Sequence, residues 1–118
     1  MLSEVLIHIT WLHRKLERAC SSEKAGRRMF GAERWRKIQS RLTVLDAAPS
    51  LADLHGAPGK WHALSADRAG QWAAMLDGNY RLIFAPDHDP LPELRSGGLD
   101  LANVTRVQII EVVDYHGR

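Results

Sequence analysis

The sequence predicts an α+β domain in which an N-terminal strand and two helices precede a mainly antiparallel sheet of three to four strands. Two observations support this prediction. Apolar residues recur at helical spacing in the first half of the chain. From Lys60 onward, short apolar runs alternate with turns rich in Gly, Asp and Pro, which is typical of strands. Helices that come before a run of strands usually pack on one face of the sheet.

Size and composition indicate one soluble domain. The chain has 118 residues, 45% of them hydrophobic and 25% charged, which is enough for one hydrophobic core. No apolar run approaches the roughly 18 residues that a spanning helix needs. Glu4 and His8 interrupt the start, where a signal peptide would be basic and then apolar. Cys20 is the one cysteine and has no disulfide partner within the chain. We therefore expect a cytoplasmic protein that does not enter a membrane.

The first half predicts one strand and two helices. Residues 2–9 have an apolar centre and predict the first strand, and residues 11–20 predict a short helix. Ser21 or Ser22 is a suitable cap for a second helix, which should end near Ala48 because Pro49 follows. Glycines weaken the first part of this helix, so a break near Phe30-Gly31 is left open. Its core-facing stripe consists of Trp35, Ile38, Leu42 and Leu45.

The second half predicts strands at residues 60–64, 71–76, 80–85 and 104–115. Asp-Gly-Asn at residues 77–79 has the chemistry of a tight hairpin turn, because Gly and Asn tolerate positive φ. Residues 86–103 are rich in Pro, Asp and Gly and predict a long loop. The last strand therefore follows a long connection.

Basic residues gather in the predicted helices. The net charge of the whole chain is +2, but residues 14–41 contain ten basic and three acidic side chains. Such a run forms a solvated helical face, a surface that binds a polyanion, or a surface that an acidic partner covers. The candidates for contact with a polyanion such as RNA are Lys15, Arg18, Lys24, Arg27, Arg28, Arg34 and Lys37.

The last strand ends in three groups that can hold or transfer protons: Asp114, Tyr115 and His116. Asp114 and His116 are two apart, so they share a face of a regular strand and Tyr115 points to the other. In that case Asp114 can orient His116, and Tyr115 either packs in the core or contacts a substrate. If the end of the strand frays, all three reach one cleft.

Three further polar residues lie in or beside the other predicted strands. Arg81 lies in an apolar strand, so it must either pair with an acid such as Asp114 or face a polar cleft, where it would clamp a phosphate. Arg68 follows Asp67 at a turn and is a second cationic candidate. His62 is either a half-buried structural histidine or a proton-transfer group. No zinc-type set of Cys and His is present, and no metal is expected.

Several short segments, in this order and spacing, make the chain resemble HigB-like toxins of the RelE/ParE superfamily, proteic killer type. The closest resemblances lie at residues 61–72 (Trp-His-Ala-Leu-Ser-Ala-Asp-Arg-Ala-Gly-Gln-Trp), 78–84 (Gly-Asn-Tyr-Arg-Leu-Ile-Phe) and 113–116 (Val-Asp-Tyr-His). Residues 15–20 and 30–34 add to it. The resemblance covers nearly the whole chain and implies a RelE-like α+β fold.

The resemblance also implies a function. HigB-like proteins are toxins of type II toxin–antitoxin modules, which cut mRNA on the ribosome without a metal and are neutralised by a HigA-like antitoxin. It implies that the catalytic set is His62, Arg68, Arg81, Asp114, Tyr115 and His116. Where the family motif often has Lys-Gly, this chain has Ser65 and Ala66. That difference removes one cation, so a ParE-like toxin that poisons DNA gyrase without cutting RNA, or a toxin that only binds its antitoxin, remains an alternative.

Overall fold

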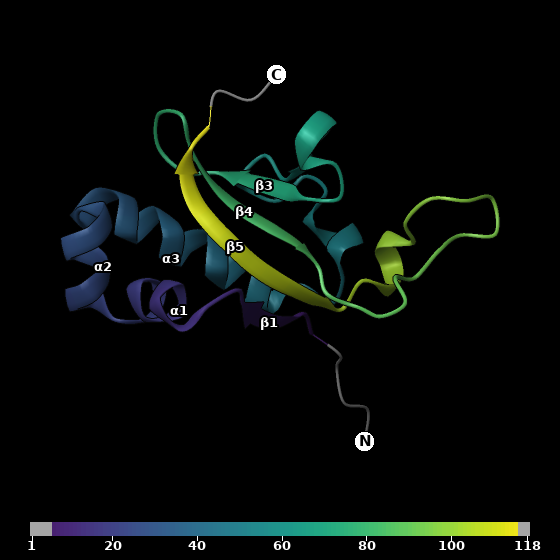
Figure 1. Cartoon of the computed structure of the whole chain (residues 1–118), viewed down its shortest axis with the longest axis horizontal. Coiled ribbons are helices and arrows are strands. Elements are labelled where there is room, and N and C mark those ends of the chain that lie inside the picture. Colours follow the sequence, from purple (N-terminus) through teal and green to yellow (C-terminus); the bar gives the residue numbers. More distant parts are fainter. Residues whose placement is uncertain (1–5, 116–118) are drawn as a thin grey trace.

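The computed structural model describes residues 6–115 and confirms the α+β class (Figure 1). The helices are α1 (Arg14–Ser21), α2 (Glu23–Phe30) and α3 (Ala32–Ala47). The strands are β1 (His8–Trp11), β2 (His62–Ala63), β3 (Trp72–Met75), β4 (Tyr80–Pro86) and β5 (Arg106–Asp114). Among the described residues, none of the helices is long and apolar enough to cross a membrane.

The five strands form one mixed sheet in the order β1-β5-β4-β3-β2. β1 is parallel to β5, and every other neighbouring pair is antiparallel. The first half of β5 therefore lies between β1 and β4, and its second half extends past the end of β1. The structure has β1 at residues 8–11, later than the predicted 2–9, because this is the segment that pairs with β5; residues 2–5 lie outside the described part.

The long helix that the sequence predicts is two helices. Gly31 separates α2 from α3 and has φ of +85°, a conformation that glycine adopts at little cost. The Ser22 hydroxyl caps α2 by accepting a hydrogen bond from the Ala25 amide at 3.2 Å. α3 ends at Ala47, close to the predicted end, two residues before Pro49. Local sequence signals therefore explain both the break and the end.

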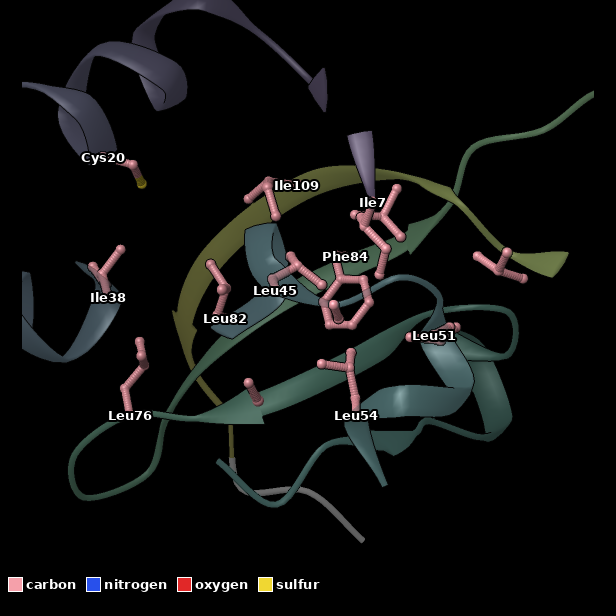
Figure 2. Close-up of a cluster of buried hydrophobic side chains, with 14 of the residues drawn as sticks. Ile7, Cys20, Ile38, Leu45, Leu51, Leu54, Leu76, Leu82, Phe84 and Ile109 are labelled. Atoms are coloured by element: carbon pink, nitrogen blue, oxygen red, sulfur yellow. The ribbon is translucent and has the colours of Figure 1, made fainter. Parts of the chain in front are cut away.

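The helices cover one face of the sheet, and the hydrophobic core lies between the two layers (Figures 1 and 2). α3 contributes Ile38 and Leu45, which are fully buried together with Leu82, Phe84 and Ile109 of the central strands (Figure 2). Burying a side chain of this size contributes about 1.5–3 kcal/mol. This layer fixes the sheet, so side chains that point away from it project from a rigid support.

Close packing between α2 and α3 depends on Gly26. A methyl group at this position would overlap the indole ring of Trp35 and the carbonyl oxygen of Ala19. The indole nitrogen of Trp35 is buried beside it and has no hydrogen-bond partner in the described part of the chain. The two helices therefore cross at a contact that only glycine allows.

Candidate functional site

Strand register determines which side chains lie on the sheet face away from α3, called here the second face. Paired residues on neighbouring strands point to the same side of a sheet. His62 pairs with Ala73, Ala73 with Ile83, and Ile83 with Glu111, which makes one row across four strands. Arg81 and Val113 form the next row. The second face therefore combines an apolar centre with cationic, acidic and imidazole groups.

A bulge in β5 brings Glu111 to this face. Ile83 pairs with Glu111, but Phe84 pairs with Ile109, so Ile110 is an extra residue in β5. Regular alternation from the buried Ile109 would turn Glu111 toward the core, because one residue of slip exchanges the faces of a strand. With the bulge, Val112 packs against the core and Glu111 lies on the second face.

Arg68 makes the most contacts at the second face. The short turn of Ala66–Arg68 carries it over the sheet. Its two Nη atoms donate hydrogen bonds to Glu111 Oε2 and Gln71 Oε1, each at 2.8 Å. Its guanidinium carbon lies 5.4 Å from the centre of the Tyr115 ring, within the range of a cation–π contact. The Arg68 side chain is 23% exposed, so it can reach a ligand above this face.

His62 has one ring nitrogen engaged and one available. Nδ1 lies 2.7 Å from the carbonyl oxygen of Lys60, which can only accept, so Nδ1 is the donor. In the neutral imidazole the lone pair is then on Nε2, which has no hydrogen-bond partner within residues 6–115. The residue is exposed in a two-residue edge strand. This tautomer suits a group that accepts a proton.

Arg81 and Tyr115 meet the turn between β3 and β4. Arg81 Nη1 donates to the carbonyl oxygens of Gly78 at 3.2 Å and Tyr80 at 3.0 Å. The Tyr115 amide donates to the carbonyl oxygen of Asn79 at 2.9 Å. The predicted hairpin turn thus holds the end of β5 and positions a second guanidinium near the second face.

The six predicted catalytic residues do not all lie on one side. His62, Arg68, Arg81 and Tyr115 belong to the second face. Asp114 pairs with Tyr80, which packs against the core, so register places Asp114 toward the helix-covered side. His116 lies outside the described residues.

Glu111 is a residue of this site that sequence reasoning missed. It is the one carboxylate in the otherwise apolar run 109–113 (Ile-Ile-Glu-Val-Val), which is the same signal that drew attention to Arg81. The bulge makes its orientation unpredictable from the sequence, because regular alternation along the strand would point Glu111 toward the core. Its contact with Arg68 joins residues 43 positions apart in sequence.

The turn before Arg68 carries a backbone conformation that its sequence does not favour. Ala66 has φ of +57°, the left-handed region that costs a residue with a side chain about 1 kcal/mol relative to glycine. This is the position at which the resembling family has glycine. The turn therefore has the backbone conformation that glycine would adopt, and Ala66 is strained in it.

The seven basic candidates divide into engaged and unengaged groups. Arg34 binds both carboxylate oxygens of Asp77, at 2.9 and 3.0 Å, and lies 3.5 Å over the Tyr80 ring, so it fastens α3 to the β3–β4 turn. Arg27 pairs with Glu23 at 2.8 Å. The side chains of the remaining five make no ion pair or hydrogen bond within the described chain: Lys15, Arg18, Lys24, Arg28 and Lys37.

Neither a metal site nor a reactive thiol is evident in residues 6–115. No group of three His, Cys, Asp or Glu side chains there lies close enough to hold an ion. In the loop after β4, Asp87 accepts hydrogen bonds from Thr10 and Arg106, and the Thr10 contact lowers its pKa. Burial raises the pKa of Cys20 to about 12, so this thiol stays protonated near neutrality.

No family model matches the chain, and no curated protein matches it. Among solved structures, it is similar to a "YoeB/ParE toxin from Agrobacterium tumefaciens", with a TM-score of 0.54 and 13% sequence identity. The match covers 93% of this chain and 100% of the other. At this identity the similarity concerns the fold, and it is the kind of fold that the sequence resemblance implies.

Proposed function

We propose that this protein is the toxin of a type II toxin–antitoxin module and a ribosome-dependent mRNA endonuclease that needs no metal. The observation that carries the proposal is the arrangement at the second face. An imidazole with a free Nε2 belongs to the same face as Arg68, Arg81 and an aromatic ring. The similarity to the fold of a toxin adds support.

The reaction assigned to these residues is a transesterification, in which the phosphoryl group moves from the 5′-oxygen to the adjacent 2′-oxygen. His62 Nε2 takes the 2′-hydroxyl proton, and the 2′-oxygen attacks phosphorus. The bond to the 5′-oxygen breaks, leaving a 2′,3′-cyclic phosphate, and a proton from a second acid completes the new 5′-hydroxyl. We assign that acid to His116. Arg68 and Arg81 neutralise the phosphate oxygens as charge builds up in the transition state.

Tyr115 offers a ring on which a base can stack, a contact worth about 1–3 kcal/mol per base. Register directs Asp114 toward the helix-covered side, so the reaction assigned here gives it no role at the second face. The expected partners are mRNA, the ribosome and a HigA-like antitoxin, and the expected location is the cytoplasm.

Co-expression with a reporter message tests the proposal. The chain is induced without an antitoxin, and primer extension maps cuts in the reporter. We expect cuts with the natural chain, loss of them with His62→Ala or Arg68→Ala, and persistence with the surface control Arg36→Ala. Cleavage that is unchanged in a His62→Ala/Arg68→Ala double variant would contradict the site assignment.

A second candidate is a toxin that acts without cutting RNA. Two observations favour it: Glu111 neutralises Arg68, and Ser65-Ala66 replaces the family's Lys-Gly. The name of the structural neighbour also joins two toxin types. A supercoiling assay with purified DNA gyrase separates the candidates, because inhibition of gyrase by a chain that leaves RNA intact supports the ParE-like alternative. A chain that does neither supports the third reading, a toxin that only binds its antitoxin.

A further inference from the structure

Lys60 has a backbone conformation that a residue with a side chain disfavours. Its φ is +49°, in the left-handed region that glycine adopts more readily than other residues. Within residues 6–115, Lys60 and Ala66 are the two residues other than glycine with positive φ, and they flank His62 in the sequence. Backbone strain of this kind persists only where the surrounding structure maintains it, and it is concentrated at functional sites.

The residues on either side of Lys60 are anchored to the sheet. The carbonyl oxygen of Gly59 accepts a hydrogen bond from the Met75 amide at 2.8 Å, which ties the segment to the end of β3. The Trp61 ring packs edge-on against the fully buried Phe84, with the ring centres 5.7 Å apart. The strain at Lys60 therefore falls between two fixed points.

Glycine is required at position 59 in this arrangement. Gly59 has φ of +129°, and a methyl group on it would lie 2.9 Å from both Arg41 Cδ and Trp61 Nε1. Arg41 Nε donates a hydrogen bond to the carbonyl oxygen of Met75 at 2.7 Å, so the Arg41 side chain could move aside only by losing that bond. The chain therefore reaches Lys60 in a fixed direction.

The conformation of Lys60 determines what His62 can bind. The carbonyl oxygen of Lys60 lies 2.7 Å from His62 Nδ1. With Gly59 anchored, an extended conformation at Lys60 would turn this carbonyl, and the strand that carries His62, in another direction. The hydrogen bond of one imidazole nitrogen determines which of the two carries the proton. The strained backbone therefore controls both the ring and its tautomer.

We propose that Lys60 is a positioning residue, whose strained backbone holds His62 as the tautomer protonated on Nδ1 and keeps the Nε2 lone pair ready to accept a proton. The catalytic purpose of this arrangement rests on the proposed nuclease function, whereas the tautomer is a property of the free protein. Lys60 acts here through its main chain, so loss of its ammonium group alone should leave the tautomer unchanged.

Heteronuclear NMR of the imidazole nitrogens tests the tautomer directly. The chain has six histidines, and comparison with the His62→Gln variant identifies the signals of His62. In the neutral ring of the natural chain, we expect the proton on Nδ1. A ring that is protonated on Nε2, or that exchanges freely between the two forms, would overturn the proposal whether or not the protein cuts RNA.

Two substitutions separate the backbone of Lys60 from its charge. Lys60→Gly and Lys60→Val both remove the ammonium, but glycine adopts φ of +49° readily and the β-branched valine does not. Lys60→Gly should keep the Nδ1 tautomer, and Lys60→Val should give a mixture of both forms. Arg36→Val is the matched control, because it removes one positive charge and adds the same side chain at an exposed position of α3, and it should keep the tautomer. Equal tautomer populations in Lys60→Gly and Lys60→Val contradict a role for the strain.

Cleavage of the reporter message then relates the tautomer to activity. Lys60→Val should cut at least about tenfold more slowly than Lys60→Gly, because a misaligned base loses much of its effect. Equal rates for these two variants would mean that Lys60 does not position His62 for catalysis. If no chain cuts RNA but the NMR results are as expected, the proposed function is wrong and the tautomer assignment stands. Circular dichroism verifies that each variant is folded, and Lys60→Ala, which carries a smaller backbone penalty, replaces Lys60→Val if that variant does not fold.

Discussion

Arg68 Nη2 and Glu111 Oε2 lie 2.8 Å apart on the second face, so the free protein holds a candidate phosphate-binding cation in an internal ion pair. A phosphate that binds Arg68 competes with this carboxylate for the guanidinium charge. Both side chains are partly exposed, which limits the strength of the pair to about 1 kcal/mol or less. Glu111 therefore moderates the affinity of Arg68 for phosphate without abolishing it.

Glu111→Gln should raise affinity for single-stranded RNA about two- to fivefold, because the pair no longer competes with the phosphate. Anisotropy titration at low and high salt measures the change, and the gain should shrink as salt rises. Glu33→Gln is the control, because it removes the same charge from a highly exposed ion pair, that of Glu33 with Arg36. Unchanged or weaker RNA binding by Glu111→Gln argues against Arg68 as a phosphate ligand.

Arg34→Ala should destabilise the fold by about 1–2 kcal/mol. The substitution removes a bidentate ion pair with Asp77, in which each side chain is at most about a third exposed. It also removes the contact with the Tyr80 ring. Urea denaturation followed by tryptophan fluorescence measures the loss. Arg36→Ala, which removes a highly exposed pair with Glu33, should cost less than about 0.5 kcal/mol. Equal effects of the two substitutions would mean that Arg34 does not fasten the β3–β4 turn to α3.

Ala66→Gly should stabilise the protein by about 0.5–1 kcal/mol, because glycine adopts φ of +57° without strain. Ala69→Gly, three residues later with φ of −54°, should instead destabilise it by a similar amount through added freedom of the unfolded chain. Thermal unfolding of both variants checks this opposite pair of effects. Destabilisation by Ala66→Gly would show that the turn has another conformation.

Cys20 should be unreactive in the native protein. It is 1% exposed, and burial raises its pKa to about 12, so almost no thiolate forms at pH 8. Ellman's reagent should label Cys20 only in denaturant. Because the folded pKa lies above the usual value of 9.0, the contribution of the neutral thiol to stability is complete below about pH 9 and is lost as pH rises toward 12. Rapid labelling without denaturant at pH 8 would contradict the burial.

The sequence predicts the elements of this fold better than their arrangement. Gly31, Pro49 and the Asp-Gly-Asn turn act locally, and the observed helices and strands begin and end near them. The pairing of β1 with β5 joins residues 98 apart, such as His8 and Arg106, and no local pattern encodes it. The site residues likewise divide into those marked by a local signal and those that depend on long-range pairing. A charge within an apolar strand singles out Arg81, whereas the ion pair between Arg68 and Glu111 depends on a bulge that interrupts strand alternation.

The placement of the last strand inside the sheet affects how the chain folds as it is made. β1 is synthesised about 98 residues before its strand neighbour β5, and β5 also supplies Glu111 to the second face. A growing polypeptide can form its helices and the β2–β4 meander early, but not the completed face. We therefore expect each new molecule to acquire binding competence abruptly, only once β5 has left the ribosome that produces it.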